Sequence, residues 1–339
     1  MAQGRKVLYF LGAGASYGAG ATAHVQGSGR IGIPTQNNFC ETFLRFSNSR
    51  SRRKRIESFL FRYFMGYGKV PSRMKPAERR RALNRIDVEE VFTFLSERAR
   101  APSTSLQLRT YAEEIWRDLV AEVGNVFRHF EANLKTKRVY RTLLKNHIRS
   151  HDAIVSFNYD TIFEDSLPNR HKWAYEGIED CTGCLSVLKP HGSVNWALSS
   201  ANTIVRNNEP EQCVVVAPTH LKFIAGPDNR EHDPGRAGYL DQSTQIQQIW
   251  HALEREMKEA RALVFIGYSF PVADLYFSSL LRSAIATRDS ALGVVIVNPD
   301  AVSLSERLSK RFSIRNIARY FDMAQFVQAS RKNVFDQIN

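Results

Sequence analysis

The sequence has no apolar stretch that approaches the roughly 18 residues of a membrane-spanning helix. Cysteine is also scarce: the chain of 339 residues contains four, too few and too scattered for a disulfide framework. Cysteines without such a framework are typical of a reducing compartment, so we expect a cytoplasmic protein that does not contact a membrane. With 43% apolar and 24% charged residues, the composition indicates one large or two ordinary globular domains.

Acidic residues are nearly missing from residues 45–85. This segment holds fourteen lysines and arginines against two acids, Glu57 and Glu78, so its net charge of +12 accounts for almost all of the +13 of the chain. Charge gathered in one segment predicts one basic surface. We expect its aromatic part, residues 56–65, to form a helix packed on protein. For the flanking arginines, our first hypothesis is contact with an acidic subunit or partner, and our second is contact with nucleic acid. A face exposed to solvent is the third alternative.

Short, almost continuous apolar runs recur along the chain and predict buried strands. They lie at residues 6–11, 153–157, 213–217, 262–266 and 293–297. Because each run is apolar throughout rather than at alternate positions, it suits a strand covered on both faces, as in a parallel sheet. Helical patterns separate the later runs, at residues 242–260, 272–286 and 301–311. This alternation predicts an α/β fold.

The interval between the first two strand-like runs has a different character. It contains no comparable run, and the apolar residues of 86–99 and 106–134 follow helical spacing. We therefore expect a basic helical subdomain at residues 45–149. It is inserted into an α/β domain that residues 1–44 and 150–339 form together.

A glycine-rich turn follows the first strand-like run as Gly12-Ala13-Gly14-Ala15-Ser16. Glycines at a strand-to-helix turn let backbone amides approach a phosphate. A dehydrogenase fingerprint would place a third glycine where this chain has Tyr17, and an acid about 20 residues later, whereas residues 20–40 contain no acid. The turn therefore indicates a nucleotide but argues against ordinary hydride transfer, and a plain tight turn remains an alternative.

Polar residues follow the second strand-like run as Asn158-Tyr159-Asp160. Ligands of open α/β sheets gather at the carboxyl ends of strands, so both polar side chains face the expected site. Asp160 could equally cap the helix that follows it. Asn158 is the more favoured functional group.

One of the nine histidines, His191, stands between proline and glycine in Lys189-Pro190-His191-Gly192-Ser193. A rigid turn of this kind can project an imidazole into a cleft, where it can serve as an acid or base near neutral pH. A structural hydrogen-bonding role is the alternative. Two more strand-like runs end in Gly267-Tyr268-Ser269-Phe270 and in Asn298-Pro299-Asp300, each of which alone would pass as a turn.

In this order, the motifs resemble the sirtuin family, and more closely its bacterial sirtuin-like branch found in antiviral defence systems. The resemblance rests on GAGAS at 12–16, GIP at 32–34, FNYD at 157–160, KPHGS at 189–193, GYSF at 267–270 and VNPD at 297–300. It implies a Rossmann-like parallel sheet flanked by helices that binds NAD+ and cleaves the nicotinamide–ribose bond.

The resemblance also implies roles for single residues. Gly12, Ala13, Gly14 and Ser16 would line the phosphates. Asn158 and Asp160 would bind the nicotinamide ribose, and His191 would be the catalytic histidine together with Asn158. The adenosine half of NAD+ would lie along Gly267, Ser269 and Asn298.

Two features depart from the deacylating sirtuins. Those enzymes follow GIP with an acidic-aromatic-basic run, whereas residues 35–37 are Thr-Gln-Asn. They also hold zinc on two CxxC pairs after the catalytic histidine, whereas this chain has one pair, Cys181 and Cys184, before His191. We therefore expect neither a structural zinc nor an acyl-lysine site.

The expected activity is an NAD+ glycohydrolase that gives nicotinamide and ADP-ribose, in the manner of an NAD-depleting antiphage effector. The alternatives are an NAD-dependent deacylase or ADP-ribosyltransferase, and a nucleotide-sensing or nucleic-acid-binding module. The resemblance implies a homo-oligomer and a partner ATPase or helicase of HerA type. Nucleic acid is a further expected partner, through residues 45–85.

Overall fold

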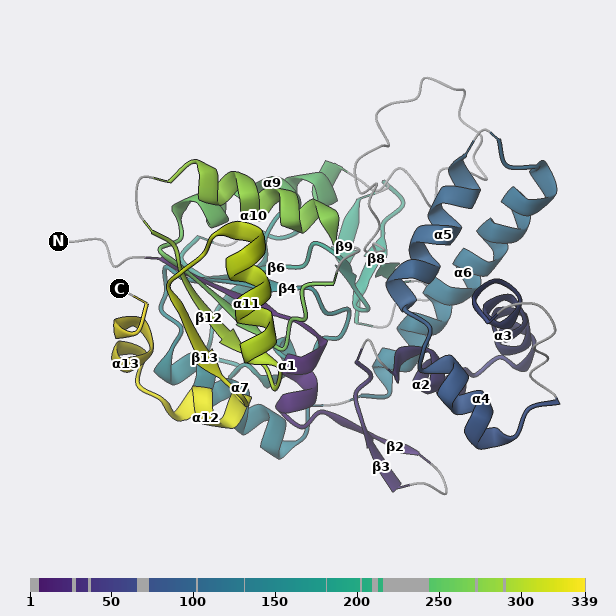
Figure 1. Cartoon of the computed structure of the whole chain (residues 1–339), viewed down its shortest axis with the longest axis horizontal. Helices are drawn as coiled ribbons and strands as arrows, with labels where there is room; N and C mark the ends of the chain where they lie inside the picture. Colours follow the sequence, from purple (N-terminus) through teal and green to yellow (C-terminus); the bar gives the residue numbers. More distant parts are fainter. Residues whose placement is uncertain are drawn as a thin grey trace.

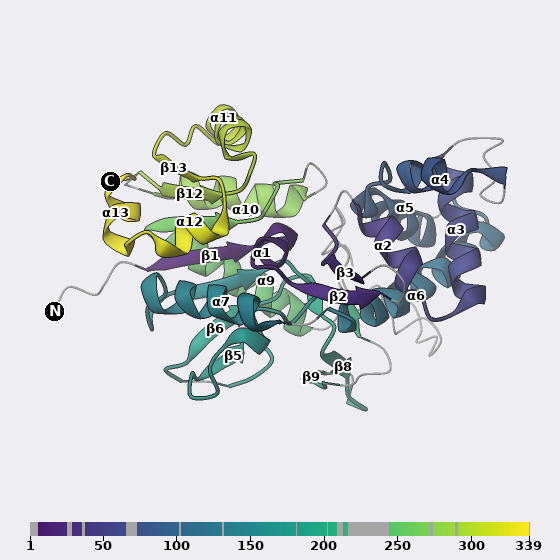
Figure 2. The ribbon, with the colours of Figure 1, turned by 90° about the horizontal axis from the view of Figure 1, so that it is seen from below.

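The computed structural model contains an α/β part and a separate layer of helices, which Figure 1 shows side by side. It describes residues 6–25, 29–35, 38–65, 73–101, 103–130, 132–180, 182–201, 203–208, 213–215, 244–271, 274–288 and 291–338. The described ends of the chain both lie in the α/β part, on the side away from the helical layer (Figure 2).

A seven-stranded sheet forms the centre of the α/β part, in the order β13-β12-β11-β1-β4-β6-β5, and all of its pairings are parallel. The strands are β1 (Val7–Leu11), β4 (Ala153–Ser156), β5 (Trp173–Tyr175), β6 (Leu185–Leu188), β11 (Ala262–Ile266), β12 (Gly293–Val297) and β13 (Ile317–Tyr320). Every residue of β1, β4, β11 and β12 is buried, as the continuous apolar runs predict. The expected Rossmann-like α/β fold is thus confirmed.

The prediction of another buried strand of this kind at 213–217 is wrong. The described part of that run forms β10 (Val214–Val215), which pairs antiparallel with β7 (Gly192–Ser193) outside the main sheet. The error has a physical reason, because burial on both faces makes a strand apolar whichever sheet it joins. A second small hairpin pairs β8 (Trp196–Leu198) with β9 (Ile204–Arg206).

Helices cover both faces of the sheet. Figure 1 shows α9 (Thr244–Glu259) and α10 (Leu275–Ala286) on one side, with α7 (Leu134–Asn146) and α12 (Met323–Gln328) on the other. The remaining elements of this part are α1 (Ala13–Gly18), η3 (Glu164–Ser166), α11 (Ala301–Phe312) and α13 (Arg331–Asp336). α7 lies within the range predicted as the insert, yet it packs on α12 and η3 of the α/β part.

The helical layer consists of α2 (Phe39–Phe46), α3 (Arg50–Phe64), α4 (Pro76–Leu83), α5 (Val88–Arg100) and α6 (Leu106–Arg128). The Asp87 and Ser105 side chains cap α5 and α6, which pack closely on each other. α3 packs on α6 and buries Ile56, Phe59 and Leu60, so the predicted helix on protein at residues 56–65 is confirmed except at its last residue. A hairpin of β2 (Thr22–Val25) and β3 (Gly29–Gly32) lies between this layer and α1 (Figure 2).

Candidate functional site

The residues predicted from the motifs lie along one edge of the sheet. β1 is paired on one side with β4 and on the other with β11, in a register that sets Leu11 opposite both Ser156 and Ile266. Because the strands are parallel, the residues that follow each strand meet at its carboxyl end. From β1 the chain continues to β4 on one side, and from β11 it continues to β12 on the other side. The point between β1 and β11 is therefore the topological switch point of the sheet, the place where α/β sheets bind ligands.

Two glycine turns touch each other at the switch point. A Cβ on Gly12 would lie 2.6 Å from the Gly267 carbonyl oxygen, so side chains are excluded there. The Gly12 amide donates to Ile266 O at 2.9 Å, and the Gly14 amide donates to Gly267 O at 3.0 Å. These two amides hold the turns together and cannot reach a phosphate unless the turns separate. Close backbone packing therefore explains the glycines more directly than a phosphate contact does.

A buried polar cluster joins β1 and β4 at this edge. Asn158 Nδ2 donates to Gly12 O at 3.0 Å and to Ser16 Oγ at 3.4 Å. Ser16 Oγ donates to Asp160 Oδ1 at 3.2 Å and lies 3.4 Å from the Tyr140 hydroxyl. The structure thus brings three predicted residues together and adds Tyr140 of α7. Asp160 Oδ1 also accepts from the Ile162 amide at 3.0 Å, which is the contact of an Asx turn. The expected helix cap is wrong, because the next helical segment, η3, begins at Glu164 with Phe163 as its N-cap.

A lysine–glutamate pair lies directly behind this cluster, and the motifs gave neither residue a role. Lys189 is fully buried, and its Nζ donates to Asp160 O at 2.5 Å and to Glu164 Oε1 at 3.1 Å. Lys189 follows β6 and Glu164 follows β4, so the pair ties the Asn158 turn to the His191 turn. The one sequence signal was a lysine at the end of an otherwise apolar run.

Burial raises the pKa of Asp160 from 3.8 to about 6, while the nearby Lys189 acts against this rise. The Asp160 carboxyl therefore binds its proton more tightly in the folded chain than in the unfolded chain. Protonation of Asp160 stabilises the fold fully below pH 3.8, and this stabilisation is lost as the pH rises through about 6. Relative to Asp160→Asn, the free energy of unfolding of the parent should fall by roughly 2–3 kcal/mol between about pH 4 and pH 7.

Urea unfolding of both proteins across this pH range measures the difference. Asp300→Asn serves as the control for the removal of one carboxylate, because Asp300 is exposed. A constant difference between the parent and Asp160→Asn at all pH values would contradict a raised pKa at Asp160.

His191 lies among aromatic rings at the end of β6. Its side chain is 5% exposed, and its ring centroid is 5.0 Å from that of Phe157 and 5.9 Å from that of Trp250. Gly192 has φ of 81°, and a Cβ there would lie 2.2 Å from Val214 O, so glycine is required directly after His191. Trp250 comes from α9, far away in the sequence, and no motif pointed to it.

The turn that carries His191 is connected to the helical layer. Gly192 pairs with Val215 of β10, and Cys213 at the start of that segment packs on α6. A Cβ on Gly124 of α6 would lie 2.8 Å from Cys213 Sγ, and the thiol lies 3.7 Å from Val120 O. The Phe127 ring of α6 also lies 6.2 Å from the ring of Tyr159. The helical layer therefore contacts the site on two sides.

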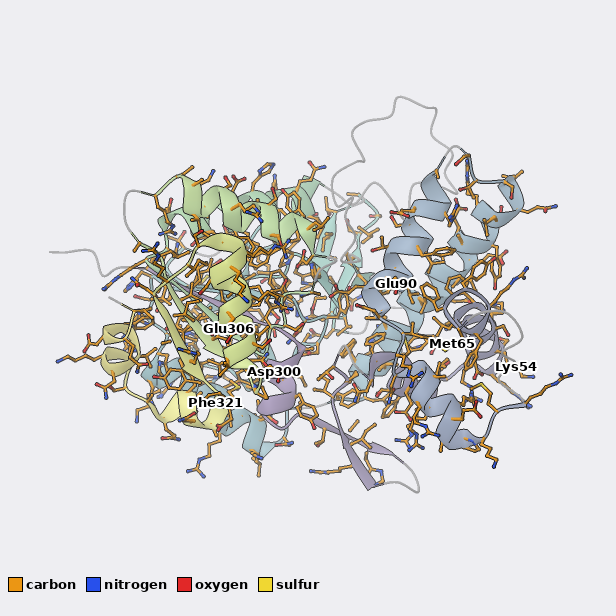
Figure 3. The ribbon with its side chains drawn as sticks, in the orientation of Figure 1. Lys54, Met65, Glu90, Asp300, Glu306 and Phe321 are labelled. Carbon is orange, nitrogen blue, oxygen red and sulfur yellow. The ribbon has the colours of Figure 1, made fainter. Side chains whose placement is uncertain are left out.

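The two turns expected to bind the adenosine half follow β11 and β12. The Tyr268 hydroxyl donates to Asp274 Oδ2 at 2.6 Å, and Phe270 adopts φ of 52°, a conformation that non-glycine residues rarely use. Ser269 is exposed between them, and its carbonyl accepts from the Arg307 guanidinium. Asn298 is half-buried, and its Oδ1 accepts from the Asp300 amide at 3.0 Å. Figure 3 shows Asp300 on the side of the α/β part that faces the helical layer.

The predicted site residues therefore form a row rather than one compact cluster. Asn298 follows β12 and His191 follows β6, four strand spacings apart in the sheet. At about 4.8 Å per spacing, the row is roughly 19 Å long. Its centre is the buried cluster of Ser16, Asn158 and Asp160.

Within the described residues, no group of three or more histidine, cysteine or acidic side chains is arranged to hold a metal ion. Cys181 lies outside them, as do residues 36 and 37 of the departure after GIP, so the absence of zinc stays a prediction. Cys40 and Cys213 are buried in different places, and burial raises the pKa of the Cys213 thiol to about 11. None of the described helices is long and apolar enough to cross a membrane.

A parallel sheet with glycine turns at its switch point and polar side chains along its carboxyl edge defines a Rossmann-like α/β domain with a ligand site outside that edge. Residues 152–318 match the family model of the SIR2-like domain, which supports placement in the sirtuin-like superfamily. SIR2-like domains use NAD+. The match covers the Asn158, His191, Gly267 and Asn298 turns, and the glycine turn after β1 lies outside it. A search of curated proteins found no match.

Proposed function

We propose that this protein is an NAD+ glycohydrolase that cleaves the nicotinamide–ribose bond to give nicotinamide and ADP-ribose. The observation that carries the proposal is the meeting of Ser16, Asn158 and Asp160 at the switch point, beside the buried His191. The row along the strand ends suits an extended ligand, with the nicotinamide half at the His191 end and the adenosine half toward Ser269 and Asn298.

In this proposal, the site acts mainly by position and electrostatics. The C1′–N bond breaks with its electron pair leaving on nicotinamide, and water adds to the cationic sugar and loses a proton. The Asn158 amide nitrogen is already bound to Gly12 O and Ser16, so the Asn158 oxygen is the group that would accept from a ribose hydroxyl or the water. His191 would act as a base toward a ribose hydroxyl. The surrounding aromatic rings would exclude bulk water.

Water is proposed as the acceptor because the acidic-aromatic-basic run that follows GIP in deacylating sirtuins is missing from the sequence at residues 35–37. From the order of the motifs, we also propose an NAD-depleting effector in antiphage defence. It would act as a homo-oligomer and with a separate ATPase or helicase of HerA type.

The purified protein, incubated with NAD+, should release nicotinamide and ADP-ribose in equal amounts, as measured by chromatography. An acyl-lysine peptide present in a parallel reaction should neither change the rate nor be consumed. Deacylation of that peptide would replace the proposal with a deacylase, and ADP-ribose attached to protein would replace it with a transferase. Saturable binding of NAD+ to the purified protein without any turnover would indicate a sensor, provided that cells expressing the protein also show no NAD+ cleavage, whether or not they are infected by phage.

A further inference from the structure

Part of the basic segment is neutralised within the chain itself. Arg55 forms two hydrogen bonds with Asp118 at 2.8 and 2.9 Å, and Arg52 NH1 lies 2.7 Å from Glu122. Both acids belong to α6 and are buried. Two more arginines of the segment pair with Glu57 and Glu41. The acidic surface that we expected on another subunit is thus supplied, for Arg52 and Arg55, by the same chain.

Nine further cations of the segment lie in its described residues and have no ion pair with any other described residue. They are Arg45, Arg50, Arg53, Lys54, Arg62, Arg73, Lys75, Arg81 and Arg85. Eight of these nine side chains are exposed, and Arg53 is partly buried. Glu78 is the one acid of the segment that is not used against an arginine in the part of the chain described. The segment therefore keeps a strong positive charge after its internal pairs are counted.

Exposed cations of this group lie on both α3 and α4 of the helical layer. On α3, Arg50 and Lys54 are exposed, whereas Ile56 and Leu60 on the other side of the helix are buried. The ion pair between Arg79 and Glu57 links α4 to α3, while α4 packs on α2. Figure 3 shows Lys54 at the end of the molecule away from the α/β part. The NAD+ site is on the opposite side of the layer.

In the part of the chain that the structure describes, this surface shows no exposed large apolar side chain of the kind that forms the centre of a stable protein interface. Among the described residues of α2 to α5, no large hydrophobic side chain is exposed. Of the aromatic residues of α3, Phe59 and Phe61 are 1% exposed, and Tyr63 and Phe64 are partly buried against the core. Stable protein interfaces place apolar and aromatic groups at their centre, whereas a phosphate backbone requires only cations. This contrast favours nucleic acid over an acidic protein.

We propose that the outer surface of α3 and α4 binds the phosphate backbone of nucleic acid. Binding does not depend on base sequence, because the exposed side chains of this surface are flexible cations, which contact phosphates rather than base edges. The proposal is independent of the NAD+ chemistry, since it uses none of the residues along the sheet edge.

The test measures binding of the full chain to a labelled 30-base-pair DNA duplex of mixed sequence, and to the matching RNA duplex and single strands. Between about 50 and 200 mM salt, affinity should fall steeply, because each phosphate contact adds about 0.9 to the slope of log affinity against log salt for duplex DNA. Replacing Arg50, Lys54, Arg81 and Arg85 with glutamate should weaken binding by at least about tenfold and reduce this slope by roughly 3–4.

The matched control replaces Arg138, Lys145, Lys310 and Lys332 with glutamate. These four cations are exposed on helices of the α/β part, so the net charge changes by the same amount at a different place. The control should keep most of the affinity, and both variants should keep the thermal midpoint of the parent.

Three results would overturn the proposal: no binding of the parent to any of the four probes at about 50 mM salt, equal losses in both variants, or equally tight binding of polyglutamate of matched charge. The last result would point to an acidic protein instead. A preference among the four probes would show which nucleic acid supplies the phosphates.

Discussion

Replacing His191 with alanine is expected to slow NAD+ cleavage by at least about 100-fold, the lower range for a positioned acid–base group. The imidazole follows β6, and its ring centroid lies 5.0 Å from that of Phe157 and 5.9 Å from that of Trp250. Asn158→Ala should cause a similar loss, because it removes the acceptor for the ribose and frees the Gly12 turn. Nicotinamide release at saturating NAD+ measures both.

His251→Ala is the matched control for His191, because His251 lies exposed on α9 and should leave the rate unchanged. Thermal unfolding of each variant must show a folded protein before its rate is compared with that of the parent. A rate close to that of the parent, in a folded His191→Ala or Asn158→Ala protein, would remove that residue from the proposed mechanism.

The second large effect concerns Gly267 at the switch point. Gly267 has φ of 62°, and a Cβ there would lie 2.1 Å from the Ala15 amide nitrogen and 2.2 Å from the carbonyl carbon of Gly14. Both neighbouring atoms belong to the backbone, so the clash cannot be relieved by the rotation of a side chain. Gly267→Ala should therefore destabilise the fold by more than about 4 kcal/mol, or prevent recovery of folded protein, since β1 and β11 would have to separate.

Gly183→Ala separates the two causes of this destabilisation, which are the strain of a positive φ and the clash of a Cβ with the neighbouring backbone. Gly183 has φ of 75°, but a Cβ placed there would have no other atom within 4 Å. Alanine there should cost about 1–2 kcal/mol, the strain of the left-handed conformation without a clash. Urea unfolding gives both values, and similar losses in the two variants would show that the close approach of the turns is not limiting.

Much of the α/β part could be predicted from the sequence because local patterns encode it. The runs that form β1, β4, β11 and β12 are apolar throughout, which is the direct signature of strands covered on both faces. Polar residues right after such runs must lie at the sheet edge, so Asn158 could be placed before its neighbours were known. His191 was indicated only by its turn between proline and glycine, because it follows β6, which was not among the predicted strands.

Contacts between distant segments could not be predicted in this way. The pairing of Lys189 with Glu164 depends on the order of strands in the sheet, and Trp250 reaches His191 from α9. Local charge counting likewise missed Asp118 and Glu122, since they follow their partners Arg55 and Arg52 by 63 and 70 residues. The spacing of Gly12 and Gly14 suggested a phosphate site from local sequence alone. In the structure, both glycines also allow close packing against the backbone of Gly267.

The connection through Cys213 gives the Asn158 and His191 turns different anchors. Asn158 is held by Gly12 within the central sheet, whereas the His191 turn is paired with β10, whose neighbour Cys213 lies on Gly124 of α6. The His191 turn also belongs to the central sheet, because it follows β6, and Lys189 ties it to Asp160 and Glu164. The contact through Cys213 is thus a second support for the imidazole, so the helical layer helps to set where the histidine lies relative to the asparagine.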